Sequence, residues 1–281
     1  MLECVPNVSE GRDARALDAF AAACGPSLLD VHVDADHHRS VFTLAGPGSL
    51  DAEDAARRLA CAVADHVDIT EHRGVHPRIG ALDVVPFVAL GDSDRADAVR
   101  AAHAFAMWAA SELMVPVFLY GDAAPDRRAL PDVRRDAFTV RAPDDGPPSP
   151  HPRLGAVAVG ARPVLVAVNC DLDRDDVALA RSIARAVRER DGGLPGVRAL
   201  GLLLASRGAV QVSMNLVDLD ATGLQEACRR VQALAEAAGA AVARVELVGL
   251  LPAAELARCD ADFRAWSGIG TEQTIEARLA S

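Results

Sequence analysis

The order of strand-like and helix-like patterns along the chain constrains its fold most, because one order occurs twice. Strand patterns are short apolar or alternating runs, whereas helix patterns place apolar residues three or four positions apart. The first half reads as strand, helix, strand, strand, helix and strand over residues 2–6, 14–24, 28–33, 40–45, 51–66 and 82–90. This β-α-β-β-α-β order is typical of a ferredoxin-like unit.

The second half repeats this order after a further helix pattern at 94–112 and a strand pattern at 115–120. A strand pattern at 155–160 comes first, and the repeated elements follow at 164–168, 173–190, 197–205, 209–217, 222–238 and 242–247. The Pro-rich segment 144–150 separates the halves and is typical of a domain boundary. We therefore expect an α+β fold of two tandem ferredoxin-like subdomains, residues 1–150 and 151–281.

Composition excludes several classes of function. The 281 residues carry a formal net charge of −11 and no basic tract, which argues against nucleic-acid or anionic-membrane binding. The chain contains no lysine, so Schiff-base chemistry is excluded. It has neither a run of about 18 apolar residues nor the basic start of a signal peptide, which predicts a cytoplasmic protein. Small molecules are the expected partners.

The loop 71–80 gathers His72, His76 and two arginines in front of a strand. Gly74 and Pro77 interrupt a regular helix, so the two histidines do not form the paired geometry of a zinc-protease helix. A histidine has a pKa near neutrality and can both accept and return a proton. The loop therefore offers a candidate acid–base group, with a purely structural histidine as the alternative.

A second cluster, Asp34-Ala-Asp-His-His-Arg39, combines carboxylates with imidazoles, the usual ligands of zinc and manganese. It supports an alternative interpretation, a metal-dependent hydrolase that uses residues 34–38. The further Asp-rich motifs of two-metal phosphoesterases are not evident, and a solvated turn in which Arg39 pairs with a carboxylate also fits. We therefore expect a metal-free site.

Two other segments are candidates for ligand binding. Gln211, Ser213 and Asn215 alternate with apolar residues and share one strand face, where their uncharged polar groups suit a pterin or an amide. A solvated sheet face is the alternative. The segment 146–155 is rich in proline and glycine and lets backbone approach an anionic aromatic ligand, or it is an interdomain linker. The hexapeptide His-Pro-Arg-Leu-Gly-Ala at residues 151–156 overlaps the end of this segment and repeats the pattern of residues 76–81.

Five motifs, taken together and in order, resemble the glutamate formimidoyltransferase family. They span nearly the whole chain: Glu3-Cys-Val-Pro-Asn-Val-Ser-Glu-Gly11, Asp36-His-His-Arg-Ser-Val-Phe-Thr43, His76-Pro-Arg-Ile-Gly-Ala-Leu-Asp-Val-Val-Pro-Phe87, Gly160-Ala-Arg-Pro163 and Gln211-Val-Ser-Met-Asn215. This family is the formiminotransferase half of the bifunctional formiminotransferase-cyclodeaminase. At 281 residues, we expect the chain to lack the helical cyclodeaminase part.

The resemblance implies two ferredoxin-like subdomains with a ligand cleft between them, in a homodimer. It also implies transfer of the formimino group from N-formimino-L-glutamate to tetrahydrofolate, a step of histidine degradation and one-carbon metabolism. Formiminoglutamate and folate are then the partners, with tetrahydrofolate as co-substrate. A non-catalytic folate-binding homologue is a further alternative.

The resemblance also implies roles for particular residues. His76 matches the catalytic histidine of the family, and residues 146–155 match its folate-binding stretch. Arginines are expected in the site because anionic substrates must bind to an acidic protein. The candidate binding residues are Arg39, Arg78, Gly146, Pro147, Ser149, His151, Arg153, Gly155, Arg162, Gln211, Ser213 and Asn215.

One position departs from the family pattern. His32 stands where family members commonly carry an aspartate that is thought to assist the catalytic histidine. Either Asp34 or Asp36 takes over that role, or activity is reduced or redirected to another folate.

Overall fold

The computed structural model describes residues 1–46, 48 and 50–281, which divide into two compact units. The first unit is Met1–Pro163 and the second is Val164–Ser281. Residues 151–163, which the sequence interpretation assigned to the second subdomain, contain a strand that pairs within the first sheet. None of the helices in the described part of the chain is long and apolar enough to cross a membrane.

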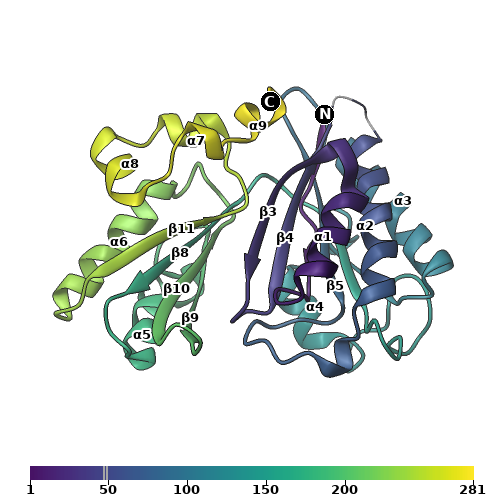
Figure 1. The fold of residues 1–281 in the computed structure, drawn as a ribbon, viewed down its shortest axis with the longest axis horizontal. Helices are drawn as coiled ribbons and strands as arrows, with labels where there is room; N and C mark the ends of the chain where they lie inside the picture. The colour runs from purple at the N-terminus through teal and green to yellow at the C-terminus, as the bar shows by residue number, and fades with distance from the viewer. Residues whose placement is uncertain (47, 49) are drawn as a thin grey trace. The chain divides into compact units, whose positions relative to one another are not determined.

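The first unit is built on one mixed sheet (Figure 1). Its strands are β1 (Leu2–Cys4), β2 (Asn7–Val8), β3 (Leu28–Asp34), β4 (Arg39–Ala45), β5 (Leu82–Ala89), β6 (Val117–Gly121) and β7 (Val157–Ala161). β1 and β2 both lie between β4 and β5 and together occupy one strand position of the sheet. Pro6, which has no N–H to donate, separates them. The order β3-β4-β1/β2-β5 is that of a ferredoxin-like sheet, and β7 and β6 extend it in parallel to β5.

Three long helices cover one face of this sheet and a short one covers part of the other. The long ones are α1 (Ala14–Cys24), α2 (Asp51–His66) and α3 (Arg95–Glu112). Asp13 and Asp94 cap α1 and α3, because their carboxylates accept from backbone N–H groups of the first turn. On the opposite face, Val133 of α4 (Leu130–Asp136) packs in a small core against β5, β6 and β7. α4 was not expected from the sequence pattern.

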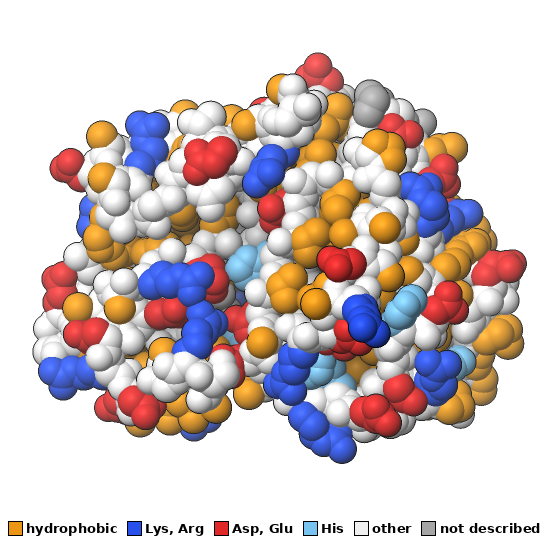
Figure 2. Space-filling model, viewed as in Figure 1, with side chains coloured by type: hydrophobic (Ala, Val, Ile, Leu, Met, Phe, Trp, Pro, Cys, Tyr) orange, Lys and Arg blue, Asp and Glu red, His pale blue; other side chains and the backbone are white. Residues whose placement is uncertain are grey.

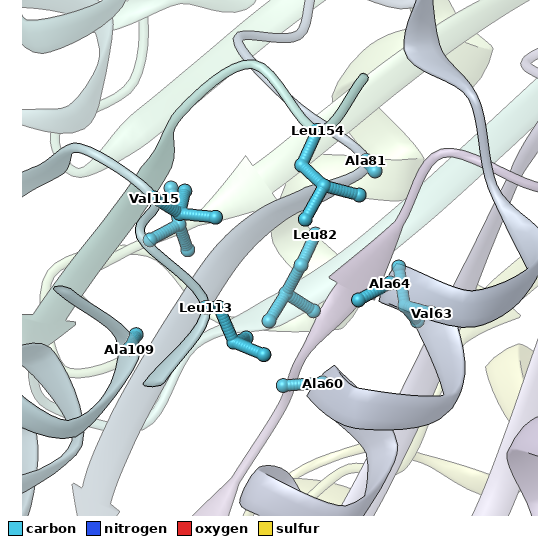
Figure 3. A pocket seen from close by; sticks show the side chains of 10 residues that line it. Ala60, Val63, Ala64, Ala81, Leu82, Ala109, Leu113, Val115 and Leu154 are labelled. Atoms are coloured by element: carbon cyan, nitrogen blue, oxygen red, sulfur yellow. The ribbon is translucent and has the colours of Figure 1, made fainter. Parts of the chain in front are cut away.

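An apolar pocket lies where α2 and α3 meet the start of β5 (Figure 3). Alanine, valine and leucine side chains alone line it: Ala60, Val63, Ala64, Ala81, Leu82, Ala109, Leu113, Val115, Leu154 and Val157. Such a lining offers no hydrogen bond to a polar substrate. We therefore regard this pocket as a packing feature of the core.

The second unit is a four-stranded antiparallel sheet with two helices on one face. Its elements are β8 (Val166–Leu172), α5 (Val177–Val187), β9 (Val197–Leu204), β10 (Ala209–Leu216), α6 (Leu224–Ala237) and β11 (Val242–Val248). The strand order β11-β8-β10-β9 is the ferredoxin-like order, so the predicted α+β class and the second repeat are confirmed. Short helices follow at α7 (Ala253–Ala257), α8 (Ala261–Ser267) and α9 (Ile275–Leu279), and 3-10 turns lie at Gly25–Ser27, Ile69–Glu71, Glu189–Asp191 and Thr271–Gln273.

The two His-Pro-Arg hexapeptides lie side by side within the first unit. The N–H of Ala81 donates to Leu154 O and the N–H of Ala156 donates to Ile79 O, both at 2.9 Å. Gly80 faces Gly155 between these bonds. Equivalent residues of the two hexapeptides are therefore related by a local two-fold arrangement that fixes the loop before β5 against the turn before β7.

Substitution of Gly80 by alanine should destabilise the protein by about 3 kcal/mol, the upper end for an overpacked core site. A Cβ there would lie 1.9 Å from Ala156 O and 2.6 Å from Leu154 O. Urea unfolding measures the effect. Gly91→Ala is the matched control, because no atom of the described residues lies within 4 Å of a Cβ placed there, and only its left-handed conformation costs about 1 kcal/mol. Equal losses in the two variants would contradict the close contact.

Candidate active site

The loop between α2 and β5 is closed by the side chain of Arg78. Its Nη1 donates to the carbonyls of Gly74 (3.2 Å) and His76 (3.1 Å), and its Nη2 donates to the carbonyl of His72 (3.2 Å). The structure thus places this candidate binding residue in the framework of its own loop. Figure 2 shows histidine and arginine side chains close together at the lower edge of the first unit.

His72 links the loop to the β3–β4 turn through its two ring nitrogens. Its Nε2 lies 2.7 Å from His38 O and its Nδ1 accepts from Gly74 N at 3.1 Å, so both ring nitrogens are used and Nε2 carries the proton. The ring stacks on that of His38 with centroids 4.3 Å apart. Burial lowers the pKa of His72 to about 4, with only partial compensation from the His38 carbonyl. His72 is therefore neutral at neutral pH and positions the backbone.

His76 has the geometry of a base. Its Nδ1 lies 2.8 Å from Pro77 O, and because a carbonyl only accepts, Nδ1 carries the proton and Nε2 holds the free lone pair. Among the described residues Nε2 has no hydrogen-bond partner. Removal from water lowers the pKa of His76 below its ordinary value, and the charges of Arg39 and Arg134 lower it further. The ring is thus neutral and able to accept a proton at neutral pH.

A buried ionic cluster lies beside His76. Asp83, at the start of β5, is fully buried and pairs with Nη1 of Arg39 at 2.7 Å and with Nη2 of Arg134. Its other oxygen accepts from Ile79 N at 2.8 Å, and Arg39 also donates to Asn7 through Nε (2.9 Å) and Nη2 (2.6 Å). Burial alone would raise the pKa of Asp83, but the two guanidinium groups hold it at about 2.

Arg39 was expected in the site from the sequence, whereas the two other members of this cluster, Asp83 and Arg134, were not. Asp83 lies inside the apolar run of β5. Because a carboxylate buried in such a run must be paired with a cation, its position in the sequence was a usable signal of an ion pair. Arg134 lies in a polar stretch that carries no such signal. Nε, Nη1 and Nη2 of Arg39 all donate to other protein groups. Arg39 therefore stabilises the site and is less suited to bind a substrate.

The Asp34–His38 turn connects β3 and β4 and is held by local hydrogen bonds. His37 N donates to Asp34 Oδ1 at 2.7 Å, and Gly11 N donates to His38 Nδ1 at 3.1 Å. The His37 and His76 ring centroids are 5.7 Å apart, so this turn borders the base. Within residues 1–46, 48 and 50–281, no group of three or more metal-ligating side chains is assembled. His32 lies half-buried on β3, opposite Val41.

The segment 146–155 ends in a tight turn, residues 151–155, which lies against the residues just before β5. His151 Nδ1 accepts from Arg153 N (3.2 Å) and Leu154 N (3.0 Å), which leaves the Arg153 side chain half-exposed and 3.8 Å from Asp68. Both bounding glycines have positive φ, 84° at Gly146 and 70° at Gly155. The remaining candidates of the segment differ in exposure, because Ser149 is exposed and Pro147 is half-buried. Outside the segment, Nη1 of Arg162 donates to Pro163 O at 3.0 Å.

In the second unit, the predicted polar face of β10 is present. Val212, Met214 and Leu216 point into the core, so Gln211, Ser213 and Asn215 face the other way. Nε2 of Gln211 donates to Asp171 Oδ1 at 2.8 Å, and burial raises the pKa of Asp171. Ser213 is half-buried and Asn215 is exposed.

A neutral histidine with one free ring nitrogen, beside buried guanidinium groups, is suited to proton transfer on an anionic substrate. Sequence comparison then identifies the class of protein. The model of the formiminotransferase domain, N-terminal subdomain, matches residues 1–162, and that of the formiminotransferase domain matches residues 167–266. The chain belongs to the formiminotransferase domain family.

Particular relatives agree with this assignment. A glutamate formimidoyltransferase of Streptococcus pyogenes serotype M1 is 38% identical over 271 residues, which cover 91% of this chain and 90% of the relative. One of Thermoplasma acidophilum is 39% identical over 269 residues, 90% of this chain and 88% of the relative. A formimidoyltransferase-cyclodeaminase of Gallus gallus is 37% identical over 275 residues, which cover 90% of this chain and 50% of that protein.

Proposed function

We propose that this chain is a glutamate formimidoyltransferase, an enzyme that transfers a formimino group from N-formimino-L-glutamate to tetrahydrofolate. The observation that carries this proposal is the match, over about nine-tenths of both chains, to two relatives that bear this name. The free Nε2 of His76 supports it, because transfer from one amine to another needs a group that accepts and returns one proton.

In this mechanism His76 acts twice. Tetrahydrofolate supplies the nucleophilic nitrogen N5. Nε2 of His76 accepts the proton that this nitrogen loses as its bond to the formimino carbon forms, and then returns it to the glutamate nitrogen as the bond from that carbon to glutamate breaks. One proton is taken and one is given, so the histidine ends neutral. Pro77 O keeps the proton on Nδ1 throughout.

Each unit contributes its own candidates for folate binding. In the first unit these are the turn residues Gly146, Pro147, Ser149, His151, Arg153 and Gly155, and in the second unit they are Gln211, Ser213 and Asn215. The turn is held rigid by reciprocal backbone hydrogen bonds between His151 and Gly155, and β10 offers uncharged side chains that can pair with a pterin. Arg162, close to Tyr120, is a further candidate for the anionic end. The cytoplasmic location expected from the sequence pattern and the homodimer implied by the family resemblance both stay predictions, and light scattering tests the dimer.

Turnover of formiminoglutamate with tetrahydrofolate tests the proposed function, and the same assay is repeated after treatment with a strong chelator. We expect product to form at the same rate before and after treatment with a strong chelator. Loss of activity on chelation and recovery with zinc or manganese would support the metal-dependent hydrolase at residues 34–38 instead. Folate binding without turnover would support the non-catalytic homologue.

The pH dependence of kcat/KM should show a base limb below pH 6.5. Only neutral His76 can accept a proton, and its pKa is lowered below the ordinary value of 6.5. Activity should therefore be level through neutrality and fall only as the pH drops through the lowered pKa. Initial rates at subsaturating substrate between pH 4.5 and 8 measure this. A limb centred above 6.5 would contradict the depressed basicity.

A further inference from the structure

Two adjacent arginines on α4 have different surroundings. The Arg135 side chain is 65% exposed and pairs with Asp132 and Asp136, all on or beside the same helix. The Arg134 side chain is 18% exposed and reaches from α4 to Asp83 of β5. Asp83 also holds Ile79 N, three residues after His76, so Arg134 is tied to the loop that carries the base.

The guanidinium of Arg134 is only partly used by the protein. Among the described residues its Nη2 alone is hydrogen-bonded, and its Nε is buried without an acceptor. Arg39, on the other side of Asp83, has all three of its nitrogens engaged. A buried N–H of a charged group is costly when it lacks an acceptor, so this arrangement favours a ligand that brings one.

The charges of the cluster point the same way. Asp83 neutralises one of the two guanidinium groups, which leaves about one positive charge beside His76. His37, from the β3–β4 turn, also acts on His76, and its ring centroid lies 5.7 Å from that of His76. An anion at Arg134 would balance this charge. A guanidinium fork matches the two oxygens of a carboxylate.

We propose that Arg134 binds a carboxylate of the formimino donor next to His76. This proposal rests on the proposed function, because it takes the donor to be an amino dicarboxylate that carries the formimino group. Binding there would hold the donor nitrogen near the free Nε2 of His76. The carboxylate would also offset the positive field on the imidazole, so that donor binding itself makes the base stronger.

The test compares Arg134→Gln with Arg135→Gln, which removes a charge from the same helix but leaves the cluster intact. We expect Arg134→Gln to raise KM for formiminoglutamate by about 10–100-fold, the range for loss of a charged hydrogen bond, while KM for tetrahydrofolate changes less than about twofold. Arg135→Gln should change neither. If KM for tetrahydrofolate rises instead, Arg134 serves the folate and the proposal is wrong.

Two donor analogues separate binding from a structural role of Arg134. N-formimino-4-aminobutyrate lacks the α-carboxylate, and N-formimino-2-aminobutyrate lacks the side-chain carboxylate. For the analogue that lacks the carboxylate bound by Arg134, kcat/KM of wild type should be about 10–100-fold lower than for formiminoglutamate. For Arg134→Gln the same comparison should give a loss of less than about threefold, because that contact is already absent. A variant that is impaired by the same factor with all three donors would have only a damaged fold, which would overturn the proposal.

A third readout is the base limb of the kcat/KM profile. Removal of the Arg134 charge relieves one cause of the low basicity of His76, so the limb of Arg134→Gln should move to higher pH. An unmoved limb would contradict the placement of Arg134 beside the base. Turnover by wild type separates the proposed function from this inference. If wild type does not transfer the formimino group, the proposed function fails. Normal wild-type turnover with an unchanged KM for formiminoglutamate in Arg134→Gln would overturn this inference alone.

Discussion

Replacement of His76 by alanine should lower kcat by about 10²–10⁴-fold, the usual contribution of general acid–base catalysis, with folate binding retained. The reason is the position of Nε2, which is the free nitrogen of a ring whose other nitrogen is fixed by Pro77 O. Steady-state kinetics with both substrates saturating measure the loss. Near-normal kcat would contradict the mechanism and turn attention to His32, His37 or His38.

His72→Ala is an instructive comparison, because His72 shares the loop but has both nitrogens engaged. It should loosen the loop and lower stability, yet reduce kcat much less than His76→Ala does. Added imidazole offers a further control. It should restore part of the activity of His76→Ala by replacing the lost base, and it should leave His72→Ala unaffected.

Replacement of Asp83 by asparagine should lower the free energy of unfolding by about 3–5 kcal/mol, because it leaves two buried or partly buried guanidinium groups without their anion. Urea unfolding at neutral pH measures this. Asp132→Asn is the matched control, since Asp132 is 43% exposed and pairs with exposed Arg135, a pair worth at most about 1 kcal/mol. Similar losses in the two variants would contradict the buried cluster.

The same carboxylate predicts acid sensitivity. The pKa of Asp83 is about 2 in the folded protein, against about 3.9 in an unfolded chain, so its contribution is complete above pH 4 and is lost as the pH falls towards 2. The loss amounts to about 2–3 kcal/mol. Asp83→Asn should therefore show a flatter decline of stability over that pH range than wild type.

The sequence predicted the element order well because that order depends on local patterns. Alternation in β10 and the helical spacing of α2 and α5 are readable within a dozen residues. The pairing of β7 with β5 and β6 was not readable, because it joins residues more than thirty positions apart, and it moves residues 151–163 into the first unit. α4 was missed because seven residues with a proline in the first turn give too little periodicity.

The candidate site was predictable in part, for the same physical reason. His76 stood out because it belongs to a long motif, and its neighbour in the loop, Arg78, looked equally available. Whether Arg78 can also bind a substrate depends on the acceptors of its guanidinium group. In the structure this group donates to carbonyls of its own loop. Arg134 reaches the site only through tertiary contact with Asp83, which no local pattern encodes.

The central claim, transfer to folate rather than release to water, is tested most directly by following the formimino carbon. N-formimino-L-glutamate labelled with ¹³C at that carbon is mixed with the protein and tetrahydrofolate, and the label is followed by NMR. We expect the label to appear on tetrahydrofolate as unlabelled glutamate forms in equal amount, and the reaction to stop when tetrahydrofolate is omitted. Release of the label as a small hydrolysis product without tetrahydrofolate would contradict it.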